Sequence, residues 1–166
     1  MKSILKNTIS SNKKYTSNGK VASYIPELKK ANQDDLGICI IDKNNNMYCA
    51  GDYNKKFTIQ SISKPIVLAL ALMDNEWEYV FSKVGMEPSG DPFNSIMKLE
   101  TNDTKKPCNP MINAGAIATT ALIKGDSLQE KEERMLAFFR KLAKNDTLQI
   151  NQSVYESEKL TGDRNR

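Results

Sequence analysis

The pattern of apolar and polar residues predicts one β-hairpin in an otherwise helical chain. Residues 36–41 form a short apolar run, residues 42–46 are rich in turn-forming types, and residues 47–50 are apolar again. Two apolar runs around a polar turn are typical of an antiparallel hairpin. A lone hairpin is marginally stable in water. Either helices cover this hairpin, therefore, or strands are missing.

Helical spacing of apolar residues predicts helices over much of the remaining chain. The expected helices are residues 1–12, 61–73, 74–84, 113–124, 127–144 and 151–160, with shorter helical turns after Pro26 and over residues 93–99. Residues 61–73 are apolar on nearly every side, which predicts a central, buried helix. Residues 85–92 and 101–110 are rich in proline, glycine and polar types and are expected to be loops.

Two of these helices carry more specific signals. The segment 113–124 is rich in small residues, which permits close approach of another backbone, and Gly125 is expected to end it. Ser127 and Glu130 have capping-box spacing, which predicts the start of the next helix. That helix should bury five apolar residues. They are Met135, Leu136, Phe138, Phe139 and Leu142.

Composition describes a globular protein with little bias toward nucleic acid or membrane. The 166 residues suggest a single domain, 1–166, and 39% of them are hydrophobic. The net charge of +4 is spread along the chain, so no nucleic-acid partner is expected. The longest apolar run, residues 66–73, is too short to cross a bilayer, and no signal peptide is visible. Three widely spaced cysteines favour a cytoplasmic protein with free thiols.

Histidine is absent, which narrows the possible chemistry. Its absence excludes Ser-His-Asp and Cys-His catalysis and the histidine-based zinc sites. The isolated cysteines show no paired spacing typical of metal ligands, so no metal is expected. Any general base that acts near neutral pH must be a lysine, tyrosine, aspartate or glutamate.

A serine followed three residues later by lysine is the most suggestive spacing, but it needs context. Ser-x-x-Lys begins at six serines in this chain. Only Ser61 and Lys64 follow an extended segment and open an apolar helix. Pro65 strengthens this assignment, because proline is tolerated in the first helical turn. The helix must therefore begin close to Ser61.

A serine and a lysine one helical turn apart can act as nucleophile and base. Backbone N–H groups at the helix start can help to bind an oxyanion. Partial burial and the helix dipole would both lower the pKa of Lys64, so that part of it is neutral. The pattern leaves open a structural alternative, in which Ser61 caps the helix and Lys64 is a surface lysine. Capping serines are common.

Longer blocks of sequence are more specific than the pair. They read GKVASYIPEL at 19–28, IQSISKP at 59–65, VGMEPSG at 84–90, NPMINAGAI at 109–117 and SEKLTGDRN at 157–165. In these blocks and their order the chain closely resembles the serine-dependent glutaminases of the β-lactamase-like superfamily. The resemblance implies an α+β, β-lactamase/transpeptidase-like fold that is helix-rich with an N-terminal β-hairpin.

The resemblance also implies an activity and a set of site residues. It implies hydrolysis of L-glutamine to L-glutamate and ammonia through a serine acyl-enzyme, with no cofactor, in an enzyme that forms homo-oligomers. Ser61 would be the nucleophile, Lys64 the base, and Tyr24 a catalytic residue in the active-site loop. The expected substrate-binding residues are Gln60, Ser61, Asn113, Glu158 and Asn165. Taken singly, Asn113 could instead cap its helix and Glu158 could be a surface residue.

The resemblance covers close to the first half of such an enzyme. It therefore implies an incomplete central sheet, and the 166-residue chain by itself is expected to be weakly active or inactive. Two alternatives stay open. One is a penicillin-recognising serine hydrolase of the same superfamily, although its Lys-Thr-Gly motif is absent. The other is a non-catalytic fragment that acts as an oligomerisation module.

Overall fold

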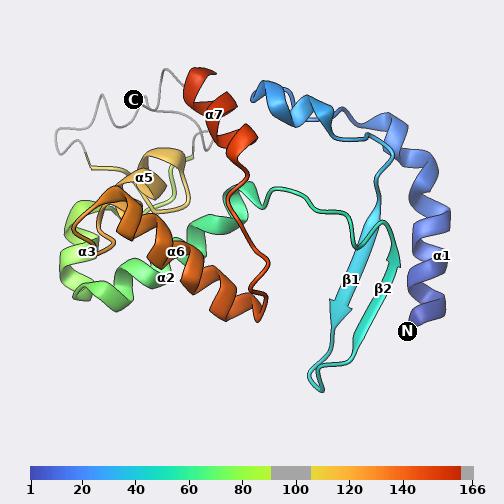
Figure 1. Ribbon diagram of the computed structural model, residues 1–166, viewed down its shortest axis with the longest axis horizontal. Coiled ribbons are helices and arrows are strands. Elements are labelled where there is room, and N and C mark those ends of the chain that lie inside the picture. The colour runs from blue at the N-terminus through green and yellow to red at the C-terminus, as the bar shows by residue number, and fades with distance from the viewer. Residues whose placement is uncertain (91–105, 162–166) are drawn as a thin grey trace. The chain divides into compact units, whose positions relative to one another are not determined.

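The computed structural model describes residues 1–90 and 106–161, and Figure 1 shows its ribbon. The α-helices are α1 (Lys2–Asn12), α2 (Ser63–Asp74), α3 (Trp77–Lys83), α5 (Asn113–Ala121), α6 (Leu128–Ala143) and α7 (Gln152–Thr161). The strands are β1 (Gly37–Ile41) and β2 (Met47–Gly51), and the short 3₁₀ helices are η1 (Lys13–Asn18), η2 (Pro26–Lys30) and η3 (Gln60–Ile62). The predicted helices and hairpin are confirmed, except that the turn expected over 93–99 lies outside the described residues.

The contacts between described residues form two compact units. One unit contains residues 1–58 and 151–161, and the other contains the described residues between 59 and 150. That the whole chain forms a single domain stays a prediction.

The first unit is built on the predicted hairpin. Strands β1 and β2 pair in antiparallel register, from Gly37 opposite Gly51 to Ile41 opposite Met47. The carboxylate of Asp42 orders the turn by accepting hydrogen bonds from the backbone N–H groups of Asn44 and Asn46, at 2.8 and 2.9 Å. Helix α1 packs along the hairpin, mainly on β2 (Figure 1).

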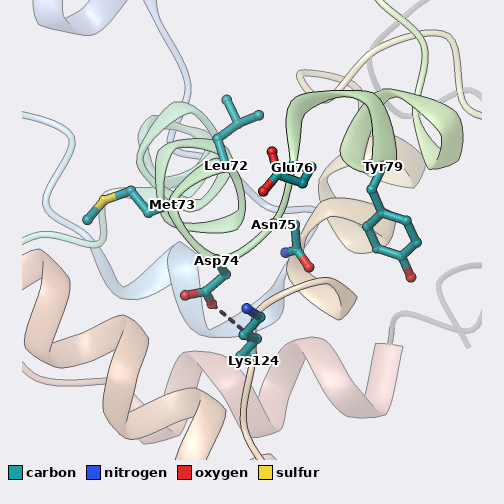
Figure 2. A pocket seen from close by; sticks show the side chains of 7 residues that line it. All are labelled: Leu72, Met73, Asp74, Asn75, Glu76, Tyr79 and Lys124. Carbon is teal, nitrogen blue, oxygen red and sulfur yellow. Dashed lines mark hydrogen bonds between the residues drawn. The ribbon is translucent and has the colours of Figure 1, made fainter.

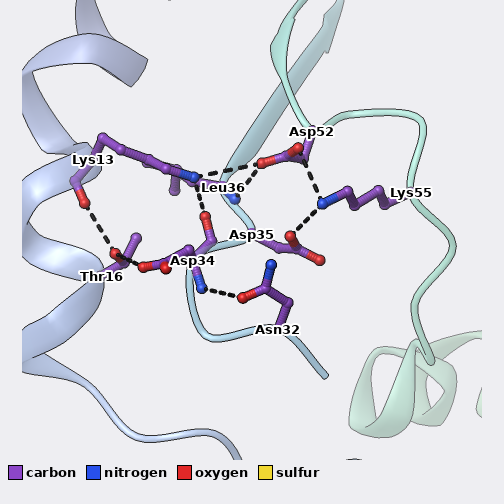
Figure 3. A network of polar contacts seen from close by, with 8 residues as sticks. All are labelled: Lys13, Thr16, Asn32, Asp34, Asp35, Leu36, Asp52 and Lys55. Atoms are coloured by element: carbon purple, nitrogen blue, oxygen red, sulfur yellow. Dashed lines mark hydrogen bonds and ion pairs between the residues drawn. The ribbon is translucent and has the colours of Figure 1, made fainter. Parts of the chain in front are cut away.

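A polar network joins the helical N-terminal segment to the base of the hairpin (Figure 3). Asp52 accepts a hydrogen bond from the backbone N–H of Leu36 at 3.0 Å and pairs with Lys13 and Lys55 at 3.7 and 3.2 Å. Lys55 also pairs with Asp35. The Leu36 hydrogen bond and the Lys55 ammonium lower the pKa of Asp52 below its usual value. These contacts fix where the hairpin starts relative to the segment before it.

Helix α7 completes the first unit by packing on η2. The backbone N–H of Glu27 donates to the Ser157 hydroxyl at 3.2 Å, across 130 residues of sequence. Ile25 and Val154, one from each of these segments, are both buried. The first and last described parts of the chain therefore belong to the same compact unit.

The core of the second unit forms where α2, α6 and the end of α5 meet. Val67, Leu70 and Ala71 of α2 are buried together with Ile123, which follows α5. The partly buried residues packed on this cluster are Leu122, Met135, Phe138 and Phe139. Asp74, at the end of α2, forms a two-point ion pair with Arg134 of α6, at 2.6 and 2.8 Å. Core and ion pair together hold α6 against α2.

The structure corrects two expectations about burial. Helix α2 is not buried on nearly every side, because Ile62 just before it and Met73 within it are 63% and 71% exposed. In α6 no residue is fully buried, and Leu142 is 55% exposed. Of the five residues expected to be buried, Met135, Phe138 and Phe139 pack on the core of α2 and Ile123. The predicted cap is correct, since the Ser127 hydroxyl accepts from the Glu130 N–H at 3.1 Å.

Candidate active site

Ser61 lies in η3, the single turn that leads directly into α2. The preceding residue, Gln60, has φ of 45°, the left-handed region that non-glycine residues seldom adopt. Its carbonyl accepts a hydrogen bond from the Ser63 hydroxyl at 2.7 Å, which helps to hold this backbone. Pro65 occupies the first turn of α2, as expected. Unusual backbone held in place by its surroundings is characteristic of functional sites.

The serine-cap alternative for Ser61 is wrong. The residue before α2 is Ile62, and no side chain caps either α2 or η3. Ser61 is exposed instead. The helix does begin close to Ser61, through the 3₁₀ turn rather than at the serine itself.

Lys64 is held by two oxygen atoms from a segment almost fifty residues away. Its Nζ donates to the side-chain Oδ1 of Asn113 at 2.7 Å and to the carbonyl oxygen of Met111 at 2.9 Å. The lysine is half-buried, and this burial lowers its pKa below the usual 10.5. The surface-lysine alternative therefore fails. A lysine with fixed N–H groups and a lowered pKa is suited to act as a base.

Asn113 is the first residue of α5, and its side chain does not cap that helix. The cap position belongs to Ile112, which has no side-chain cap, while Asn113 Oδ1 accepts from Lys64. The helix-cap alternative for Asn113 is therefore wrong. The structure brings together Lys64, which its spacing from Ser61 singled out, and Asn113, which the resemblance singled out.

Asn109 orders the loop that places the two Lys64 acceptors. Its Oδ1 accepts from the backbone N–H groups of Met111 and Ile112 at 2.9 and 3.2 Å, and its Nδ2 donates to the carbonyl of Glu87 at 2.8 Å. Neither Asn109 nor the Met111 carbonyl was among the predicted site groups. The Asn109-Pro110 dipeptide, which favours turn initiation, was the available signal for the first. A backbone acceptor has no signal in the sequence.

Glycine lets α5 approach this loop closely. A Cβ atom on Gly115 would lie 1.8 Å from the carbonyl oxygen of Asn109, a distance that only the absence of a side chain permits. Gly85 is similar, because its Cβ would lie 2.4 Å from the carbonyl oxygen of Cys108. Gly115 thus allows α5 to approach another backbone closely, as its small residues predicted.

The remaining predicted site residues belong to the first unit or lie outside the described residues. Tyr24 precedes η2 and is 66% exposed, and Glu158 is exposed on α7. Their segments pack on each other through the bond between Glu27 and Ser157. Asn165 lies outside the described residues. Within the second unit, therefore, Gln60, Ser61, Lys64 and Asn113 form the candidate site.

A pocket at the other end of α2 contains none of the predicted residues (Figure 2). Its lining residues are Leu72, Met73, Asp74, Asn75, Glu76, Tyr79 and Lys124. The Asp74 carboxylate already accepts from the Lys124 backbone N–H at 2.8 Å and pairs with Arg134. This pocket is therefore not the site of the serine and lysine.

Residues 1–90 and 106–161 contain no cluster of cysteine, aspartate and glutamate suited to hold a metal ion. In the same part of the chain, no helix has the length and apolar character that crossing a membrane requires.

In this helix-rich α+β protein, a serine in the turn before a helix and a half-buried lysine one turn later have the spacing typical of the serine–lysine type of acyl-transfer site. Comparison with known proteins narrows this class. The family model described as Glutaminase matches residues 19–166. The chain belongs to the glutaminase family, and its fold is accordingly the β-lactamase-like fold of that family.

Individual relatives agree with this assignment. The chain is 77% identical over 163 residues to the glutaminase of Clostridioides difficile (strain 630), a match that covers 98% of this chain and 53% of the relative. A probable glutaminase from Bacillus subtilis, complexed with 6-diazo-5-oxo-L-norleucine, is 35% identical with a TM-score of 0.84, covering 99% of this chain and 48% of that one.

A third similar structure is that of Mglu in its glutamate form. It is 36% identical to this chain with a TM-score of 0.88, and the match covers 99% of this chain and 38% of Mglu. The present chain spans about half the length of the curated relatives it matches.

Proposed function

We propose that the protein carrying this chain hydrolyses L-glutamine to L-glutamate and ammonia, with Ser61 as nucleophile and Lys64 as its base. The observation that supports this most strongly is the bond of 2.7 Å between Lys64 Nζ and Asn113 Oδ1. It joins the Ser-x-x-Lys segment to residues 109–117, another of the blocks by which the chain resembles glutaminases.

The two acceptors of Lys64 explain how a lysine could serve as the base. A neutral amine has two N–H groups and one lone pair, and the oxygens of Asn113 and Met111 can accept from both N–H groups. The lone pair of the neutral amine is then the group that we propose takes the hydroxyl proton of Ser61. Burial favours this neutral form by lowering the pKa of Lys64.

The proposed reaction has two balanced steps. In the first, Ser61 Oγ attacks the side-chain carbonyl carbon of glutamine, and its proton passes through Lys64 to the leaving nitrogen, so that ammonia departs and an ester forms. In the second, water attacks the ester carbon and loses a proton to the Lys64 amine. Lys64 passes this proton to Ser61 Oγ as the ester bond breaks, so that the serine hydroxyl is restored and glutamate leaves.

The substrate contacts follow from the chemistry of glutamine. A carboxylate such as Glu158 suits the α-ammonium group, whereas the amides of Gln60, Asn113 and Asn165 suit the α-carboxylate or the side-chain amide. Tyr24 is proposed as a catalytic residue near the substrate. The phenol can donate to or accept from the reacting groups.

The comparisons favour glutaminase over the penicillin-recognising hydrolase. The relative from Clostridioides difficile is called a glutaminase, the probable glutaminase from Bacillus subtilis was solved with 6-diazo-5-oxo-L-norleucine, and Mglu was solved in its glutamate form. Neither description indicates a penicillin. A cytoplasmic location and assembly into a homo-oligomer are further parts of the proposal, which rest on the thiol composition and on the resemblance.

Ammonia release from L-glutamine tests the proposal, with variants of two Ser-x-x-Lys pairs in the protein that carries this chain. Ser61→Ala and Lys64→Met should abolish release. Ser3→Ala and Lys6→Met remove an exposed pair with the same spacing on α1 and should leave the rate unchanged. Equal activity in all four variants would refute the proposal, and acylation by a penicillin without glutamine turnover would favour the alternative hydrolase.

A further inference from the structure

Cys39 and Cys49 face each other across the hairpin of the first unit. Cys39 of β1 is paired directly with Cys49 of β2, and the two thiols are in contact, with Cys49 Sγ donating to Cys39 Sγ at 2.9 Å. Both are free cysteines. The candidate active site uses neither of them.

The register puts this pair where two strands come closest. In an antiparallel ladder, hydrogen-bonded and non-hydrogen-bonded pairs alternate. The Asp42 N–H donates to the Asn46 carbonyl at 3.1 Å, which makes that pair a hydrogen-bonded one. Three positions along, Cys39 and Cys49 form a non-hydrogen-bonded pair. Such pairs have Cα atoms about 4.5 Å apart, within the range of about 4.4–6.8 Å that a disulfide can bridge.

The two thiols differ in their exposure to solvent. Cys39 is exposed, so an oxidant reaches its sulfur first, whereas Cys49 is half-buried. The hydrogen bond to Cys39, with some burial, raises the pKa of the Cys49 thiol, which therefore holds its proton and acts as the donor. A reactive thiol beside a second one is the arrangement in which a resolving cysteine completes a disulfide.

We propose that Cys39 and Cys49 form a site of reversible oxidation, which low-molecular-weight disulfides convert to an intrachain disulfide across β1 and β2. The Cys39 thiolate attacks one sulfur of the oxidant and displaces the first small thiolate, which leaves a mixed disulfide on Cys39. Cys49 gives up its proton and attacks Cys39 Sγ, displacing the second small thiolate. The protein dithiol is oxidised, and the oxidant is reduced to two thiols.

Oxidised glutathione is the probe that tests this site, applied to the protein and followed by trypsin digestion without reduction. Cleavage after Lys30, Lys43 and Lys55 places Cys39 in peptide 31–43 and Cys49 in peptide 44–55. We expect these peptides to be joined by a disulfide that dithiothreitol breaks, while Cys108 keeps its thiol or carries glutathione alone. The linkage should form at a rate independent of protein concentration, because both sulfurs belong to one chain.

Three single variants provide the controls. Cys108→Ser should cross-link as the unmodified protein does. Cys39→Ser and Cys49→Ser should each leave one hairpin thiol that accumulates glutathione without a cross-link. The proposal is overturned if the unmodified protein holds a stable glutathione adduct on Cys39 while peptides 31–43 and 44–55 stay separate. It is also overturned if they are joined only between molecules.

Discussion

Replacing Asn113 by aspartate tests whether the neutral form of Lys64 does the chemistry. The substitution keeps an oxygen at the position that accepts from Lys64 Nζ at 2.7 Å, but adds a negative charge there. A nearby carboxylate stabilises the ammonium form and typically raises a lysine pKa by about 1–3 units. This change opposes the effect of burial, which lowers the pKa of Lys64 from 10.5.

The size of the expected effect follows from the proton balance. At a pH below the pKa of Lys64 in both the unsubstituted protein and the variant, the neutral fraction of Lys64 falls about tenfold for each unit by which its pKa rises. A tenfold change corresponds to about 1.4 kcal/mol. Asn113→Asp should therefore lower kcat near neutral pH by about 10- to 1,000-fold. The loss should shrink as the pH rises, because the variant amine then deprotonates too.

The assay is the rate of ammonia release from saturating L-glutamine across the pH range. In Asn113→Asp, the part of the pH–rate profile in which the rate rises with pH (the ascending limb) should move to higher pH. Asn151→Asp is a matched control, because Asn151 also accepts at a helix start, from the Val154 N–H at 3.1 Å, and should leave the limb in place. A uniform loss in Asn113→Asp, with the limb unmoved, would refute the link between Asn113 and the protonation of Lys64.

Two further predictions concern stability, measured by urea unfolding. Asp74→Asn should cost about 1–3 kcal/mol, because it removes the ion pair with Arg134. Arg134 lowers the pKa of Asp74, so the stabilisation by the ion pair is present at pH values above the unfolded pKa of 3.8 and is lost as the pH falls through the lowered pKa. The cost of Asp74→Asn should therefore disappear at low pH, and the same cost at every acid pH would contradict this. Gly115→Ala should cost about 1–3 kcal/mol, because its Cβ would lie 1.8 Å from the Asn109 oxygen. Gly19→Ala, whose nearest atom would be 3.8 Å away, should cost less than about 0.5 kcal/mol, and similar costs for the two glycines would refute the argument.

Local signals in the sequence were sufficient for the hairpin and for the start of α6, whereas α5 ends at Ala121 and not at the expected Gly125. The strands β1 and β2 and the Ser127 cap lie where the pattern predicted them, because turn chemistry and capping act between near neighbours. Burial was harder to predict. The apolar stripe of α6 correctly indicated an amphipathic helix, but its contact surface depends on the length of its partner, and Leu142 stays 55% exposed.

The sequence suggested residues for the candidate site but not the contacts between them. Spacing and Pro65 selected Ser61 and Lys64, and only the resemblance selected Asn113. The hydrogen bond between Lys64 and Asn113 joins positions 49 residues apart, so no periodicity reveals it. The second acceptor, the carbonyl of Met111, is a backbone atom that every residue possesses.

The residue that 6-diazo-5-oxo-L-norleucine modifies tests the central claim most directly. A nucleophile that displaces nitrogen from this diazoketone keeps a covalent adduct, which peptide mass spectrometry can locate. The account predicts one adduct, on Ser61, formed faster as Lys64 loses its proton, and absent in Ser61→Ala. An adduct on a different residue, or equal labelling of Ser61→Ala, would contradict the assignment of Ser61 as the nucleophile.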